Sequence, residues 1–239
     1  MKILALDSSG LVASVAVAED DTLLGEYTVN YKKTHSQTLL PMLDEVVRMI
    51  ELDLSTVDAI AIAAGPGSFT GLRIGSATAK GLGLALGKPL VAVPTTEALA
   101  YNLYGVRDWI CPMMDARRSQ VYTGIYRFEN GRLVTYKPQA PVAVSEIAEQ
   151  LNALGQEVIF LGDGVPVYQE LLGSLMKVPY QFAPAHVNRQ RAASVAALGM
   201  LYAREGRFET AAEHRPEYLR LSQAERERAE ALAAEKENK

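Results

Sequence analysis

The sequence predicts an α/β protein built from two related lobes, each a mixed sheet with helices. Apolar runs separated by turns come first, and strand-like and helical segments then alternate in the order βββαβαβα. The same series begins again at Trp109, which indicates an internal duplication. We therefore expect an N-terminal lobe at 1–106, a C-terminal lobe at 107–221 and a charged tail at 222–239.

The first half should open with an antiparallel meander. Its three apolar runs occupy residues 2–9, 13–20 and 22–31. The acidic pair Asp20-Asp21 stands between the second and third runs and fits a tight turn. Two of these strands are therefore expected to pair as a hairpin.

A helix is expected to begin at Thr34. Thr34 and Gln37 have the spacing of a capping box, and Pro41 should bend the first turns. The apolar residues of this helix cover about half of its circumference, which is wider than the stripe of an ordinary surface helix. Two interpretations stay open: a broad contact with the core, or a face that also meets another chain.

Strand and helix alternate through the rest of the first half. Residues 57–65 are apolar apart from Asp58, which is typical of a parallel strand buried on both faces. The glycine-rich segment 63–89 should contain the following helix. Residues 88–94 are expected to form a strand and residues 96–105 a helix.

The second half repeats the plan. A strand should end at Asp115, and the dipeptide Asn130-Gly131 predicts the turn of a hairpin. The tail carries charges of both signs without a strong apolar face, so we expect a frayed or disordered helix there. The remaining elements are expected at 145–154 (helix), 157–164 (strand), 165–175 (helix) and 190–205 (amphipathic helix).

The glycine-rich segment has a nucleotide interpretation and a packing interpretation. It lacks a P-loop, and Thr70 stands where the GxGxxG pattern needs its third glycine, although the GPGS turn before a helix could hold an anion. Helical glycines cost about 0.8–1 kcal/mol each relative to alanine. We favour close packing as the compensation for Gly71, Gly75, Gly81 and Gly83, on a helix covered on nearly all sides. Periodicity does not say whether the neighbour is this chain or a partner.

Composition narrows the class of protein. The net charge is −4 over 239 residues, which gives no broad basic surface for nucleic acid. The lone cysteine, Cys111, excludes an internal disulfide framework. No apolar run approaches the roughly 20 residues of a membrane helix, and the N-terminal apolar run is too short for a signal peptide. We expect a cytoplasmic protein without membrane association.

Several motifs resemble the TsaB family, also called YeaZ. They are LALDSS, HSQTLLPMLDEVV, AIAAGPGSFTGLRIG, VPTTEALA, MDARRSQVYTGIY and PEYLR, which together run to about residue 221. The resemblance implies an actin-like ATPase fold (ribonuclease H-like) of two related lobes. It also implies a part in the tRNA modification that places threonylcarbamoyl on N6 of adenosine 37.

The same resemblance implies a non-catalytic role. In that pathway the metal is held by two histidines of a paralogue, TsaD, and the corresponding positions here are Thr95 and Leu99. Neither side chain can replace an imidazole ligand. We therefore expect no metal site, a heterodimer with TsaD, a TsaE ATPase partner, a possible homodimer, and contact with tRNA through the complex.

Candidate site residues follow from these expectations. Asp7, Ser8 and Ser9 stand where actin-like ATPases keep a first phosphate loop, and Gly162–Gly164 resembles the second. Either these are weak or vestigial ATP/ADP sites, at most at a junction with a partner, or they are ordinary strand ends; we favour strand ends. The candidate partner interface comprises His35, Leu39, Leu40, Leu43, Val47, Gly71, Arg73 and Gly75.

Several other residues, and two other classes of function, fit parts of the sequence. Asp115 is expected to be structural, the roles of Arg117 and Arg118 stay open, and His186 and His214 should be solvated. The alternatives from other classes are a metal-dependent glycoprotease-like peptidase and a small-molecule kinase of the actin fold. The missing histidines oppose the peptidase, and the kinase would need an ATP cleft and a catalytic carboxylate such as Asp7 or Asp115.

Overall fold

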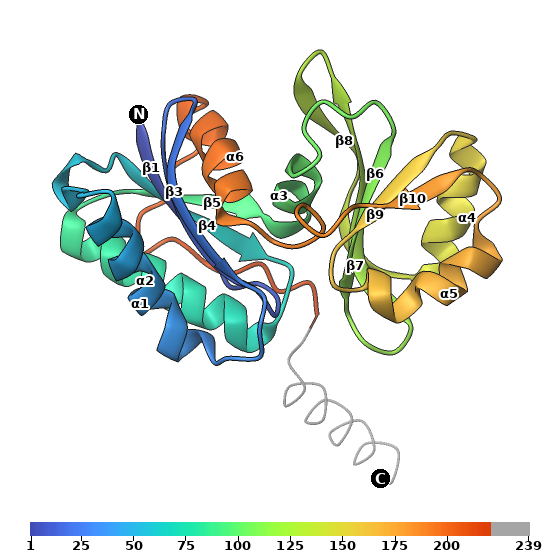
Figure 1. The fold of residues 1–239 in the computed structure, drawn as a ribbon, viewed down its shortest axis with the longest axis horizontal. Helices are drawn as coiled ribbons and strands as arrows, with labels where there is room; N and C mark the ends of the chain where they lie inside the picture. Colours follow the sequence, from blue (N-terminus) through green and yellow to red (C-terminus); the bar gives the residue numbers. More distant parts are fainter. Residues whose placement is uncertain (221–239) are drawn as a thin grey trace, which may run out of the picture.

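The computed structural model describes residues 1–220, and the predicted tail at 222–239 lies outside this range. Two five-stranded mixed sheets, each flanked by helices, form two lobes side by side (Figure 1). This is the two-lobed architecture expected of the actin-like fold. None of the described helices is both long enough and apolar enough to cross a membrane.

The first lobe contains the predicted meander followed by alternating helices and strands. Its turn at Asp20 has a positive φ of 47°, as a tight hairpin turn requires. Its elements are β1 (Lys2–Asp7), β2 (Ala13–Glu19), β3 (Thr22–Val29), α1 (His35–Met49), a 3₁₀ turn (Leu54–Thr56), β4 (Ala59–Gly65), α2 (Phe69–Leu86), β5 (Leu90–Pro94) and α3 (Thr95–Tyr101).

The second lobe repeats this order, and Asn130 and Gly131 form its hairpin turn with φ of 51° and 76°. Its elements are β6 (Trp109–Asp115), β7 (Gln120–Glu129), β8 (Arg132–Ala143), α4 (Val144–Leu154), β9 (Val158–Leu161), α5 (Val165–Leu175), β10 (Tyr180–Phe182) and α6 (Ala192–Arg204). The predicted duplication is therefore confirmed at the level of topology. The strands lie in the order β3-β2-β1-β4-β5 in one sheet and β8-β7-β6-β9-β10 in the other.

The last helix of each repeat packs on the sheet of the other lobe. Buried residues of α6, such as Val195 and Leu198, share a core cluster with the first sheet. Leu99 of α3 shares a cluster with β6, β7 and β9 of the second lobe. Residues 205–217 also run back along the first lobe, where Glu209 pairs with Leu90 at the edge strand β5. Helix α6 and Glu209 therefore pack on the first sheet, although the predicted C-terminal lobe at 107–221 includes them.

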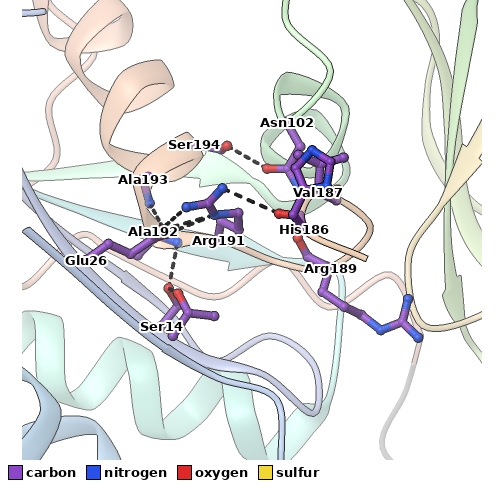
Figure 2. Close-up of polar contacts among 11 residues, drawn as sticks. Ser14, Glu26, Asn102, His186, Val187, Arg189, Arg191, Ala192, Ala193 and Ser194 are labelled. Atoms are coloured by element: carbon purple, nitrogen blue, oxygen red, sulfur yellow. Dashed lines mark hydrogen bonds and ion pairs between the residues drawn. The ribbon is translucent and has the colours of Figure 1, made fainter. Parts of the chain in front are cut away.

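The two chain crossings between the lobes are tied together by Asn102. Its Nδ2 donates to the carbonyl oxygens of Val187 and Arg189, at 2.9 and 2.7 Å, and its Oδ1 accepts from Ser194 Oγ at 2.6 Å (Figure 2). Asn102 opens the outward crossing, and residues 183–191 make the return crossing. This cluster of bonds joins the two crossings to the start of α6.

The first turn of α6 is fixed to the first sheet at the same place. Ala192 N–H donates to Ser14 Oγ at 2.8 Å, and Ala193 N–H donates to Glu26 Oε1 at 3.1 Å (Figure 2). The Glu26 carboxylate also pairs with the Arg191 guanidinium, and its side chain is only 10% exposed. A carboxylate at a helix N-terminus satisfies a free N–H and complements the helix dipole. The return crossing is therefore anchored on β2 and β3.

Some local predictions need correction. Thr34 is the N-cap of α1, but its side chain makes no capping bond, so the predicted capping box does not form. Strand β8 continues through Pro138 and Pro141, because it is an edge strand and needs no N–H donor on its outer side. His214 is fully buried, with Nδ1 bonded to Glu209 at 2.9 Å, whereas we expected it to be solvated; His186 is exposed.

Candidate functional site

A cavity of about 790 Å³ lies between the lobes. The first lobe contributes the β1–β2 turn, His35 and the start of α2, and the second contributes the β6–β7 turn and Asp163. Residues 217–220, which follow α6, form a further part of the wall. The cavity is therefore a cleft assembled from segments far apart in the sequence.

The polar side chains at the end of β1, in the first-lobe wall, form hydrogen bonds within that lobe. Asp7 Oδ1 accepts from both the N–H and the Oγ of Ser9, at 2.9 and 2.7 Å. Ser8 Oγ donates to the carbonyl of Gly71 on α2 at 2.9 Å. All three of these side chains are buried, and each has a partner within the chain. Hydrogen bonds within the chain of this kind are typical of a structural strand end.

The second-lobe wall repeats this geometry around Asp115. Asp115 is the last residue of β6 as Asp7 is of β1, and its Oδ1 accepts the N–H two residues on, from Arg117, at 2.8 Å. By topology, the counterpart of the first phosphate loop is thus the β6–β7 turn. The predicted second loop, Gly162–Gly164, instead follows β9 and corresponds to Gly65–Gly67 after β4. Gly65 and Gly162 share a positive φ, of 124° and 108°.

Burial sets the charge state at the base of the cleft. Burial is the main cause that raises the pKa of Asp7, to about 6; the nearby Asp163 acts in the same direction, while the hydrogen bonds from Ser9 and the charge of His35 act against it. Burial also raises the pKa of Asp163. His35 bonds to the Gly10 carbonyl through Nε2 at 2.8 Å, and its Nδ1 is buried without a partner.

The start of α2 is mostly satisfied by its own chain. Ser68 is the N-cap and its Oγ accepts from Gly71 N–H at 3.3 Å, while Ser68 N–H donates to the Ser9 carbonyl. A Cβ on Gly67 would stand 2.2 Å from Ser9 O. The GPGS turn is thus packed against the β1–β2 turn, which supports the packing interpretation and supplies a neighbour within the chain.

The structure narrows the predicted partner interface. Leu39 and Leu43 are buried in the core of the first lobe, and a Cβ on Gly71 or Gly75 would meet Ser8 at 2.0 or 2.4 Å. These four residues pack inside the chain and present no surface to a partner, so their assignment to an interface is corrected. Val47 is half-buried against the same core, and His35 lines the cleft. Only Leu40 and Arg73 of the predicted set are exposed.

Helix α2 is not covered on nearly all sides, contrary to the prediction. Gly81 has open space where a Cβ would lie, and Leu84 is 74% exposed. Ala77 and Arg73 share this outer side at helical spacing. Gly71 and Gly75 therefore face the β1–β2 turn, whereas Gly81 lies on the side of the same helix that faces solvent.

The positions that correspond to the paralogue's metal ligands have structural roles here. Thr95 Oγ1 accepts from Gly65 N–H at 3.1 Å, and Leu99 packs in the core between the lobes. Thr96 bonds to the buried hydroxyl of Tyr126 at 2.7 Å and to Gln139 at 2.8 Å. Within residues 1–220, no three His, Cys, Asp or Glu side chains are grouped to hold a metal ion.

Sequence reasoning missed the part of the cleft wall formed after α6. The rings of Tyr218 and Phe69 are in tilted contact with centroids 4.7 Å apart, and the Arg73 guanidinium lies over the Phe69 ring at 4.0 Å from its centroid. Arg220 bonds to the Ala116 carbonyl and to Gln120 in the second lobe. Only the PEYLR motif marked this segment, and its spacing gave no sign of where it would pack.

Known proteins match the chain over most of its length. Residues 22–228 match the family model described as TsaD: tRNA N6-adenosine threonylcarbamoyltransferase. The tRNA threonylcarbamoyladenosine biosynthesis protein TsaB of Bacillus subtilis is 34% identical over 227 residues, which are 94% of this chain and 96% of the relative. TsaB of Escherichia coli is 30% identical over 72% of this chain and 75% of its own.

A solved structure supports the same relationship. YeaZ from Pseudomonas aeruginosa has a TM-score of 0.79 and 28% identity, and the match covers 91% of this chain and 99% of that one. The duplicated two-lobed fold, the match to the TsaD family model and relatives of this similarity agree with one another. The chain belongs to the TsaB (YeaZ) family.

Proposed function

We propose that this chain is a non-catalytic subunit for threonylcarbamoylation of tRNA adenosine in the cytoplasm. Its partner would be the paralogue TsaD, which supplies the metal and the transfer chemistry, with TsaE as the ATPase of the complex. The names of the TsaB relatives support the pathway. The side chains at Thr95 and Leu99 support the division of labour, because they serve packing and cannot replace imidazole ligands.

The observation that carries the partner proposal is an exposed side of α2 that has few large side chains. Leu84 is 74% exposed. Ala77 and Gly81 are exposed on the same side of this helix, and their small size lets another backbone approach closely. Leu40 and Met49 of α1 are also exposed, at 52% and 69%, but they lie on opposite sides of their helix and are not part of this surface. We call Ala77, Gly81 and Leu84 the docking face. Exposed apolar side chains of this kind favour protein contact.

The docking face would serve both proposed dimers. A heterodimer with TsaD joins two chains of related fold, and a homodimer would reuse the same residues around a twofold axis. Arg73 stands at the edge of this face on α2. We propose that tRNA meets the assembled complex, since the net charge of this chain is −4.

Nucleotide binding by this chain alone is proposed to be weak. The cleft has room for a mononucleotide, and Arg117 and Arg118 line it. However, Asp7, Ser8 and Ser9 are engaged with one another and with Gly71. The same engagement argues against the kinase alternative, because a phosphate would have to break these bonds. Calorimetry with ATP and ADP tests both statements.

The test of function is binding to TsaD followed by reconstitution. Gly81→Arg and Leu84→Asp place charge on the docking face without touching the core, so each should weaken the heterodimer at least about tenfold, equal to about 1.4 kcal/mol. Leu171→Asp is the matched control, since Leu171 is 40% exposed on α5 of the other lobe. Modified adenosine is then followed with each component omitted in turn. Full modification without this chain, or an unaffected heterodimer with both variants, would refute the proposal.

A further inference from the structure

The segment after α6 runs back along the first lobe (Figure 1), and its residues 217–220 line the cleft. Glu209 exchanges backbone hydrogen bonds with Leu90, at 2.8 and 2.9 Å, and Lys80 Nζ donates to the His214 carbonyl at 3.0 Å. His214 is fully buried. Residues 205–216 are therefore anchored to the first lobe at Glu209 and His214, and residues 217–220 reach the second lobe.

Residues 217–220, which we call the clasp, hold the first lobe at two points. Glu217 N–H donates to the Ala64 carbonyl at 2.7 Å, and the Glu217 carbonyl lies so close to Gly65 that a Cβ there would stand 2.4 Å from it. The Tyr218 ring contacts that of Phe69 at the start of α2. The clasp is thus fixed to both β4 and α2 at the edge of the cleft.

The clasp also holds the second lobe at two points. The Glu217 carboxylate accepts from Gln139 Nε2 on β8, and the same nitrogen donates to the Gly65 carbonyl at 3.1 Å. The Arg220 guanidinium donates to the Ala116 carbonyl and to Gln120 Oε1. These last two partners stand on either side of the β6–β7 turn.

That turn has an uncommon backbone. Arg117, Arg118 and Ser119 have φ of 65°, 55° and 54°, and such conformations are unfavourable for residues other than glycine unless surrounding contacts hold them. Arg220 supplies two such contacts. The clasp contacts are polar or partly exposed, since Tyr218 is 40% exposed, so this part of the chain can open without unfolding a core.

We propose that residues 217–220 form a releasable clasp that holds the two lobes together across the cleft and keeps the β6–β7 turn in its left-handed conformation. Releasing either end of the clasp lets the lobes separate about the two chain crossings joined by Asn102. The cleft then becomes accessible and the turn relaxes. The proposal concerns the isolated chain and does not depend on the proposed partner.

Amide hydrogen exchange of the full chain tests this inference. In Arg220→Ala and in Tyr218→Ala, exchange should rise about tenfold or more both at 66–72 and at 116–122, because either substitution releases one end of the clasp. Arg204→Ala is the matched control: Arg204 pairs with Asp20 within the first lobe, away from the cleft lining, so exchange in both segments should stay at the wild-type rate.

The outcomes separate the clasp from simpler explanations. Faster exchange at 116–122 alone in Arg220→Ala would mean that Arg220 braces only its own turn, and the proposal would be wrong. Wild-type exchange at 66–72 in Tyr218→Ala would overturn it as well. If Arg220→Ala proves unfolded by circular dichroism, Gln120→Ala removes one of the same contacts from the second lobe and should raise exchange in both segments.

Discussion

The three glycines Gly71, Gly75 and Gly81 of α2 should respond to the same substitution in opposite ways. In a helix, replacing glycine by alanine gains about 0.8–1 kcal/mol of propensity. At Gly81 nothing lies within 4 Å of the added Cβ, so the whole gain should appear as stability. Gly81→Ala should therefore raise the free energy of unfolding by about 1 kcal/mol, and Tm by roughly 2–4 °C.

Gly75 has the same propensity gain but lacks the space. Its Cβ would stand 2.4 Å from Ser8 Oγ and 3.1 Å from Ile62 Cδ1. Ser8 Oγ cannot rotate away without losing its bond to the Gly71 carbonyl. Overpacking of this kind costs about 1–3 kcal/mol, so Gly75→Ala should be neutral to destabilising by about 2 kcal/mol.

Gly71 should be the most sensitive of the three. Its Cβ would stand 2.0 Å from the backbone oxygen of Ser8, which no side-chain rotation can relieve. Gly71→Ala should shift the β1–β2 turn and lose more stability than Gly75→Ala. Urea denaturation of the isolated chain measures all three, with an unchanged m-value as the check that the unfolded state is comparable. Equal stability of the Gly75 and Gly81 variants would refute the packing argument.

Two further predictions concern the cleft base and the chain crossings. Asp7→Asn should raise the free energy of unfolding above about pH 6, by up to about 3 kcal/mol. Burial raises the pKa of Asp7 from 3.8 to about 6, so the wild-type protein loses stability as the pH rises through that interval, and the variant does not. In urea denaturation the difference should vanish below about pH 4, and an equal difference at both pH values would contradict the prediction. Asn102→Ala removes three hydrogen bonds between the crossings, each worth about 1 kcal/mol, and should lower stability by about 2–3 kcal/mol, whereas an unchanged Tm would show that the crossings are held by packing alone.

The sequence predicted what local patterns control. The order of strands and helices, the hairpin at Asn130-Gly131 and the buried strand at Ala59–Gly65 all depend on residues close together in the chain. The full length of β8 could not be read from local patterns, because Pro138 and Pro141 are acceptable within a strand only at a sheet edge.

What the sequence did not predict depends on contacts between distant segments. Periodicity placed Gly75 and Gly81 in one helix but could not tell which would face the β1–β2 turn. The burial of His214 follows from the return of the chain to the edge of β5. Likewise, an amphipathic pattern at 190–205 predicted a helix but not that it would cover the sheet of the other lobe.

The cleft illustrates how a duplicated fold can keep a geometry and change its chemistry. In each lobe an aspartate ends the first strand and accepts the N–H two residues on. In the first lobe, Ser8 and Ser9 follow Asp7, and their hydroxyls bond to the Gly71 carbonyl and to Asp7. The glycine-rich side of α2 packs closely against this turn. In the second lobe, arginines follow Asp115 in an open, left-handed turn that Arg220 braces. One wall of the cleft is therefore engaged in packing against α2, and the other is held by contacts with Arg220.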